Sequence, residues 1–236
     1  MSVTRAPIAI ALDTNEINTA KEWATLTSPQ ISTMKLGLEF FTRFGISGVS
    51  DVMELAHGAQ LFLDLKLHDI PNTVAGAASS VAGLAPTYLT VHASGGAAMI
   101  SAAAQALPQT RITAVTVLTS LAPDDLARMG FPSDISMLVK SLAISAVDAG
   151  ARAIVCSPQE VGMLREVLPR EIHLLTPGVR PAGSAQDDQE RVSTPAEAFA
   201  HGADLVVIGR PITSLWNPHS PHLMSEGLAE IISGLE

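Results

Sequence analysis

Short apolar runs rich in β-branched residues alternate with stretches of helical spacing along the whole sequence. Several helical stretches end at a glycine just before the next run, as at Gly58, Gly150 and Gly202. Glycine there supplies the left-handed conformation that ends a helix. Strands that alternate with helices form parallel sheets. We predict eight strands, at residues 8–13, 32–37, 60–67, 88–93, 111–118, 151–157, 173–178 and 205–210, and the clearest helices at 18–26, 123–130, 135–150 and 158–168.

Eight strand–helix units in 236 residues match a (β/α)8 TIM barrel, whose usual length is about 250 residues. The alternative α/β architecture, a doubly wound open sheet, usually carries G-x-G-x-x-G after its first strand. Here the first strand leads into "ALDTNEI", which has no glycine. Because no low-complexity or Gly/Ser-rich linker divides the chain, we expect one barrel domain over residues 1–236.

The composition narrows the class of ligand and compartment. A net charge of −9 argues against nucleic acid, whose phosphates need a basic surface, and an anionic ligand would need a local cationic site. The single cysteine, Cys156, allows no disulfide within the chain, disfavours a cysteine-based zinc site and fits a reducing cytosol. The N-terminal apolar run stops at Asp13, too short for a membrane helix and without a cleavage site. We expect a cytoplasmic protein that binds neither nucleic acid nor membrane.

Polar residues gather where the predicted strands end. In this fold the active site lies at the C-terminal ends of the strands. Charged residues make up only 16% of the chain, yet half of these end positions are charged. The pattern predicts an assembled polar site from Asp13, Lys35, Asp64, Lys66, His92, Thr119, Ser120, Ser157, Pro177 and Arg210.

The run "LFLDLKLHDIPNT" (61–73) is the most unusual of these strand ends, because buried strands rarely contain charge. Asp64 and Lys66 are two residues apart and therefore face the same side of a strand. Lys35, from the neighbouring strand, can face the same mouth, and Asp69 follows closely. A structural ion pair is the simpler interpretation of a lone Asp-x-Lys, but this cluster favours a functional site.

Other candidates leave alternatives open. Asp13 suits either the N-cap of the first helix or a ligand contact. His92 suits either a hydrogen bond behind the site or a ligand contact, whereas His68 falls on the opposite strand face and is interpreted as structural. His219 and His222 lie in "PHSPHL", expected to be a loop without a metal.

The last strand ends in "VIGRPIT", where Gly209 permits close backbone approach and Arg210 offers a fork of donors. In barrels the loops after strands seven and eight often hold a phosphate beside a short helix. The loop after strand seven, 178–195, is long, polar and rich in small residues, as a ligand lid would be. Its Arg180 and Gln189 can reach the same anion.

Together these motifs resemble the orotidine 5'-phosphate decarboxylase family over essentially the whole chain. The central motif is Asp-x-Lys-x-x-Asp-Ile-Pro-x-Thr, supported in order by "IALD" (10–13), "MKLG" (34–37), "TVLTS" (116–120), "TPGVRP" (176–181), "DDQER" (187–191) and "VIGRPI" (207–212).

The resemblance implies decarboxylation of orotidine 5'-phosphate to uridine 5'-phosphate without a cofactor or metal, in a homodimer. Lys66 would protonate C6 of the pyrimidine, Asp64 would lie against the departing carboxylate, and Lys35 would hold Asp64 and the ribose hydroxyls. Asp69 would reach into the partner's site. The remaining contacts implied are Asp13 to ribose, Ile70, Pro71 and Thr73 beside Asp69, Thr119 and Ser120 to the pyrimidine, Pro177 along the base, and Arg180, Gln189, Gly209 and Arg210 to the phosphate.

The proposed chemistry explains the alternating charges. Loss of carbon dioxide leaves an electron pair at C6 that the ring delocalises poorly, and a fixed ammonium stabilises it without solvent reorganisation. Neighbouring carboxylates favour the charged form of that ammonium. The rival functions are a magnesium-dependent sugar-phosphate enzyme sharing the Asp-x-Lys-x-x-Asp barrel, and a non-catalytic phosphate-binding barrel.

Overall fold

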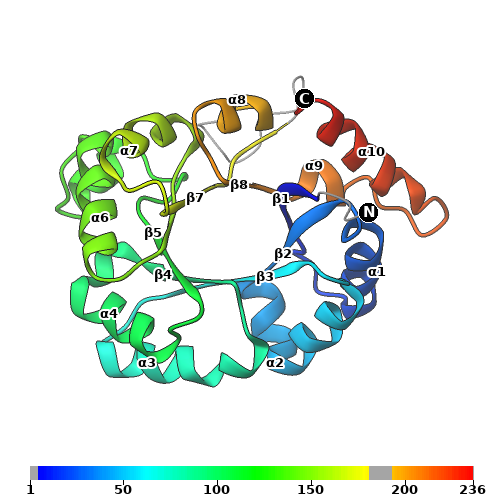
Figure 1. The fold of residues 1–236 in the computed structure, drawn as a ribbon, viewed down its shortest axis with the longest axis horizontal. Helices are drawn as coiled ribbons and strands as arrows, with labels where there is room; N and C mark the ends of the chain where they lie inside the picture. The colour runs from blue at the N-terminus through cyan, green and yellow to red at the C-terminus, as the bar shows by residue number, and fades with distance from the viewer. Residues whose placement is uncertain (1–4, 181–192, 236) are drawn as a thin grey trace.

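The computed structural model describes residues 5–180 and 193–235, and its strands form one closed parallel barrel. They pair in sequence order, and the last strand pairs with the first (Figure 1). The predicted (β/α)8 architecture is therefore confirmed. The strands are β1 (Ala6–Ala11), β2 (Ile31–Gly37), β3 (Gln60–Leu67), β4 (Tyr88–His92), β5 (Arg111–Val115), β6 (Ala153–Val155), β7 (His173–Thr176) and β8 (Leu205–Ile208).

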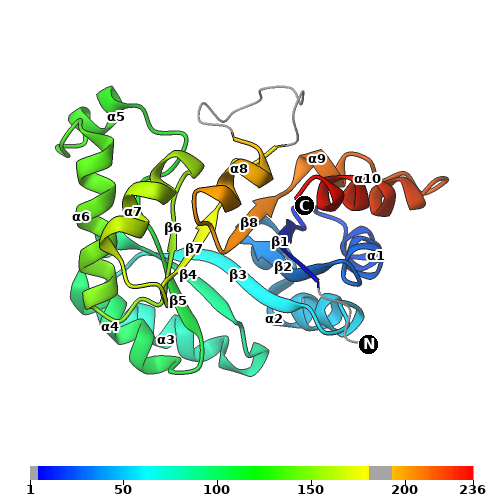
Figure 2. The ribbon, with the colours of Figure 1, turned by 45° about the horizontal axis from the view of Figure 1, so that its top comes forward.

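Helices surround this ring of strands, as Figures 1 and 2 show from two directions. Gly58, Gly150 and Gly202 have positive φ values, as expected for glycines that end helices. The α-helices are α1 (Ile17–Thr27), α2 (Leu38–Leu55), α3 (Pro71–Ser80), α4 (Ala97–Ala106), α5 (Pro123–Arg128), α6 (Ile135–Asp148), α7 (Val161–Val167), α8 (Pro195–Ala200), α9 (Arg210–Thr213) and α10 (His222–Ser233), with short 3₁₀ turns η1 (Ala82–Leu84), η2 (Ala93–Gly95) and η3 (Pro158–Glu160).

The hydrophobic core has two parts because a parallel barrel buries both faces of its strands. The larger part lies between strands and helices and includes Ile8, Leu63 and Leu89. The smaller part is formed by inward-facing residues, and it fills the barrel interior: Ala9, Phe62, Tyr88, Ala153, Leu175 and Leu205. The interior is thus a packed floor, and an open site is confined to the strand ends.

Several strands end two or three residues earlier than the apolar pattern predicts. The fifth strand stops at Val115 rather than at 118, and the eighth stops at Ile208, so that Arg210 begins α9. The predicted helix at 158–168 is a 3₁₀ turn followed by α7. Asp13, Thr119 and Pro177 therefore lie just beyond their strands, whereas Lys35, Asp64, Lys66 and His92 remain inside β2, β3 and β4, near the C-terminal ends of those strands. Among the described residues, no helix is long and apolar enough to cross a membrane.

Candidate active site

A cavity of about 300 Å³ lies at the C-terminal ends of the strands. Its floor is apolar and includes Phe62, Val155 and Val207. Four cationic and two anionic side chains line it, although the protein as a whole carries a net charge of −9. The cavity therefore presents locally the positive charge that an anionic ligand requires; its charged residues are Lys35, Lys66, Arg180, Arg210, Asp13 and Asp64.

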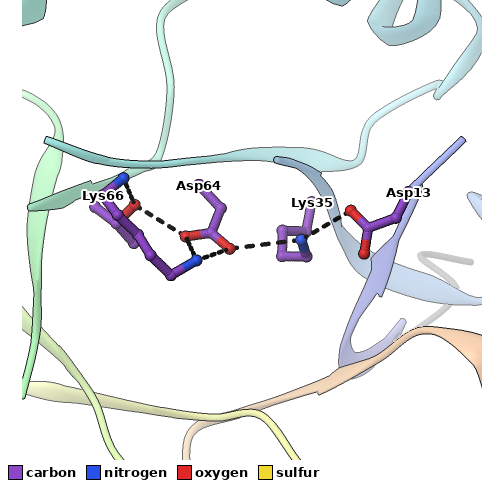
Figure 3. A network of polar contacts seen from close by, with 5 residues as sticks. Asp13, Lys35, Asp64 and Lys66 are labelled. Atoms are coloured by element: carbon purple, nitrogen blue, oxygen red, sulfur yellow. Dashed lines mark hydrogen bonds and ion pairs between the residues drawn. The ribbon is translucent and has the colours of Figure 1, made fainter. Parts of the chain in front are cut away.

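Four of these side chains form a continuous row of alternating charge (Figure 3). The Lys66 Nζ donates to both carboxylate oxygens of Asp64, at 2.8 Å each. The Lys35 Nζ lies 3.5 Å from Asp64 Oδ2 and 3.2 Å from Asp13 Oδ1. Asp64 and Lys35 are each 8% exposed. The row thus runs from the exposed carboxylate of Asp13 through two buried groups to Lys66.

The neighbouring charges set the ionisation of the two buried groups. Burial favours the neutral form of Lys35, but the carboxylates of Asp64 and Asp13 outweigh it, so the pKa of Lys35 is raised. Burial likewise opposes ionisation of Asp64, but Lys35 and Lys66 outweigh it, and the pKa of Asp64 is lowered. Both groups are therefore charged at neutral pH.

The backbone of β3 is irregular where it carries the pair. Leu63 pairs with Leu89 and Leu67 with Val91, so four steps along β3 match two steps along β4. Lys66 has a φ of 48°, a left-handed value that costs a non-glycine residue about 1–3 kcal/mol. The expectation that Asp64 and Lys66 share one side is confirmed by their contact, but a bulge with a strained residue produces it rather than regular strand alternation.

Most of the residues expected at the site line this cavity. Arg180, which follows β7, and Arg210, which follows β8, line the cavity together with the charged row. The backbone N–H of Arg180 donates to the Ser193 carbonyl at 3.0 Å, and this bond holds the two ends of the long loop together. The predicted residues that line the cavity are Asp13, Lys35, Asp64, Lys66, Thr119, Pro177, Arg180, Gly209 and Arg210.

Another group of expected residues lies outside the cavity of its own chain. Asp69 and Ile70 are exposed, and the Asp69 carboxylate accepts from the Ile70 N–H at 2.6 Å. Pro71 and Thr73 are exposed in the first turn of α3, and Ser120 is exposed beyond β5. None of these five lines the cavity. Gln189 and residues 181–192 of the loop expected to act as a lid (178–195) lie outside the described residues.

The open alternatives for Asp13 and the histidines are partly resolved. The N-cap of α1 is Glu16, so the interpretation of Asp13 as that cap is wrong. The His92 and His68 rings lie 5.3 Å apart, and both line a separate cavity of about 170 Å³. Burial, with His68 and Lys66, lowers the pKa of His92. His222 begins α10.

Ser157 is buried at the N-cap of η3, does not line the cavity, and its N–H donates to the Glu160 carboxylate at 2.8 Å. In the described part of the chain, no group of three His, Cys, Asp or Glu side chains could hold a metal ion.

Thr90 is a polar contact of the site that the sequence interpretation missed. It is fully buried on β4, accepts from the Lys66 N–H at 2.8 Å and donates to Asp64 Oδ1 at 3.0 Å. A hydroxyl inside the apolar run "YLTVH" is the only sequence signal for it, since the strand register is not visible in the sequence.

Comparison with known proteins places this geometry in a defined family. The model of the "Orotidine 5'-phosphate decarboxylase / HUMPS family" matches residues 6–220. Orotidine 5'-phosphate decarboxylase of Thermobifida fusca is 57% identical over 216 residues, covering 90% of this chain and 91% of the relative. The Rhodospirillum rubrum enzyme of the same name is 46% identical, covering 92% and 91%. A crystal structure of the Lactobacillus acidophilus enzyme matches with a TM-score of 0.78 at 34% identity, covering 95% of this chain and 98% of that one.

Proposed function

The chain belongs to the orotidine 5'-phosphate decarboxylase / HUMPS family, and we propose that it converts orotidine 5'-phosphate to uridine 5'-phosphate, the last step of de novo pyrimidine biosynthesis. It is a carbon–carbon lyase. The observation that carries this function is the alternating row Asp13–Lys35–Asp64–Lys66 in a cavity with an excess of positive charge. Such a row fixes an ammonium where negative charge develops on carbon.

Lys66 is the proposed acid. The bond between C6 and the carboxylate breaks, carbon dioxide leaves, and the electron pair remains on C6. The Lys66 ammonium then gives one proton to C6, and solvent returns a proton to the amine. Two opposite unit charges about 4 Å apart attract by roughly 4 kcal/mol at an effective dielectric constant near 20. Because Asp64 holds the Lys66 Nζ at 2.8 Å, this attraction requires little reorganisation.

Asp64 and Lys35 are proposed to frame the reacting carbon. The Asp64 carboxylate would lie against the departing carboxylate, and Lys35 would hold Asp64 from its other side while reaching the ribose hydroxyls. The contact of Lys35 with both Asp64 and Asp13 supports this assignment. Asp13 is half exposed, with a side chain 52% accessible, and is proposed to bind ribose.

The base and phosphate are proposed to occupy opposite parts of the cavity. Thr119 and Ser120 would contact the pyrimidine, and Pro177 would pack along it. Two cationic arms, Arg180 after β7 and Arg210 at the start of α9, line the same cavity and suit a phosphate dianion. Gly209 and Gln189 complete the proposed phosphate contacts.

We also propose a homodimer in which Asp69, Ile70, Pro71 and Thr73 complete the partner's site. Their exposure supports this proposal, because Ile70 is 66% exposed and Asp69 makes no ion pair within its own chain among the described residues. An exposed isoleucine beside an acidic side chain suits burial against another subunit. We propose further that residues 1–236 form one catalytic domain, which acts in the cytoplasm.

The proposed function is tested by the ultraviolet absorbance change when purified protein is mixed with orotidine 5'-phosphate. Conversion to uridine 5'-phosphate and carbon dioxide, undiminished by EDTA, is the expected result. Loss of activity with EDTA would favour the magnesium-dependent sugar-phosphate chemistry. No conversion, with phosphate ligands still bound, would favour a non-catalytic binding barrel.

A further inference from the structure

The Thr90 hydroxyl connects two groups of the site through bonds whose directions are fixed. The Lys66 backbone N–H can only donate, and an ionised Asp64 carboxylate can only accept. The hydroxyl therefore accepts from Lys66 at 2.8 Å and donates to Asp64 Oδ1 at 3.0 Å. Thr90 has no exposed surface, so water does not compete for either bond.

This link lies where the strand ladder is interrupted. Between the pairs Leu63–Leu89 and Leu67–Val91, β3 contains the bulge that includes Asp64 and Lys66. The Lys66 N–H bonds to a side chain of β4 at this point, and Lys66 itself is left-handed. A single hydroxyl thus fixes the backbone of one charged residue and the carboxylate of the other.

We propose that Thr90 is a positioning residue for decarboxylation: its hydroxyl holds the bulged Lys66 backbone and the Asp64 carboxylate in the relative orientation that places the Lys66 ammonium beside C6. This inference rests on the proposed function. It assigns Thr90 no contact with substrate, since Thr90 does not line the cavity. The hydroxyl also helps to lower the pKa of Asp64, after the larger effects of Lys35 and Lys66.

Thr113 shows what a buried threonine without this role looks like. It is the register partner of Thr90 on β5 and is also fully buried. Its hydroxyl donates to the Arg111 carbonyl of its own strand at 2.9 Å and touches no charged group of the site. Thr113→Val is therefore a matched control for burying a methyl group in place of a barrel hydroxyl.

The experiment compares Thr90→Val, Thr90→Ser and Thr113→Val with wild type in steady-state decarboxylation. Thr90→Val is expected to lower kcat by roughly 10- to 100-fold, because small displacements of reacting groups have effects of this size. KM should change much less, since phosphate and ribose contacts are intact. Thr90→Ser, which keeps the hydroxyl, should restore most of the rate, and Thr113→Val should match wild type.

The pH dependence of kcat separates positioning from simple stability. Without the Thr90 hydroxyl the pKa of Asp64 rises, so the acidic limb of the Thr90→Val profile should move to higher pH, while that of Thr113→Val stays in place. A normal kcat and an unmoved acidic limb in folded Thr90→Val would overturn the proposal. A kcat of Thr90→Ser as low as that of Thr90→Val would also overturn it.

Two further measurements keep the outcome decisive. If Thr90→Val does not fold, the comparison moves to Thr90→Ser against Thr90→Ala, which differ by one hydroxyl; equal rates would overturn the proposal. If wild type does not decarboxylate, the proposed function fails separately. Crystal structures of wild type and Thr90→Val then test positioning directly, and an unchanged Lys66–Asp64 contact would contradict it.

Discussion

The ammonium of Lys66 lies 2.8 Å from both carboxylate oxygens of Asp64, two residues earlier on the same strand. A contact this close between neighbours on one strand face depends on the bulge and on the left-handed φ of Lys66. The site therefore contains local strain, as is common where a protein fixes reactive groups.

Replacing Lys66 by alanine is expected to remove the proposed proton donor and the positive charge that we propose lies beside C6. A positioned acid alone contributes about 10²- to 10⁴-fold to rate, so kcat should fall by at least that factor in the ultraviolet assay. Lys140→Ala, at an exposed position on α6, is the matched control and should behave as wild type. Substantial turnover by Lys66→Ala would contradict the assignment of this residue as the acid.

Asp64→Asn should destabilise the protein at neutral pH, because Lys35 and Lys66 would lose their shared carboxylate. Removing one partner of a buried pair costs about 3 kcal/mol or more, which corresponds to a Tm lower by roughly 6–12 °C for a chain of this size. The difference should depend on pH. Because the pKa of Asp64 is lowered below 3.8 on folding, its stabilisation is present above pH 3.8 and is lost as the pH falls through the lower folded value.

Thermal melts of wild type and Asp64→Asn from pH 7 down to pH 3 measure this dependence. The gap between the two Tm values should begin to narrow below pH 3.8. A gap that stays constant with pH would mean that the loss comes from packing rather than from charge.

Arg210→Ala tests the proposed phosphate site. Loss of one charge-assisted contact should lower kcat/KM for orotidine 5'-phosphate by roughly 10- to 100-fold. With the nucleoside orotidine, which has no phosphate, the variant and wild type should be equally slow. Arg43→Ala, on the exposed surface of α2, is the control. An equal loss of kcat/KM with orotidine 5'-phosphate and with orotidine would mean that Arg210 does not act through the phosphate.

The shared-site dimer predicts rescue between two inactive variants. A mixed dimer of Lys66→Ala and Asp69→Ala subunits contains one site with both an intact Lys66 and the partner's intact Asp69. After unfolding and refolding an equal mixture, random assembly should restore about a quarter of wild-type activity. Each variant refolded alone is the control. If light scattering shows dimers but no activity is restored, Asp69 does not act in the site of the partner subunit.

The eight strand–helix units were predictable because each strand is an apolar run and several helices end at a glycine, as at Gly58, Gly150 and Gly202. The C-terminal limits of the strands were not: Val117 continues the apolar pattern of "RITAVTVL", but the ladder stops at Val115. A residue that is buried at the barrel mouth and a residue that pairs with the next strand are both apolar. The apolar pattern therefore cannot show where the strand pairing ends.

The sequence predicted which residues form the charged row, but it did not predict the backbone geometry that brings them together. Lys35, Asp64 and Lys66 follow from their positions at strand ends. The bulge and the contact of Thr90 with Asp64 and Lys66 depend on the register of β3 against β4. That register is set by the pairing of two separate segments and is not visible in either segment alone. The role of Asp13 was ambiguous for a similar reason, since Glu16 takes the cap and leaves Asp13 to pair with Lys35.

The pairing of β8 with β1 also sets the moment at which the cavity can exist during synthesis. Asp13 and Arg210 come from opposite ends of the chain yet line one cavity. A nascent chain that has left the ribosome only as far as β7 already contains Lys66 and Asp64, but its first strand still has an open edge. Arg210, which we propose to bind the phosphate, and the strand that closes the barrel are therefore synthesised together, so the complete cavity can form only near the end of translation.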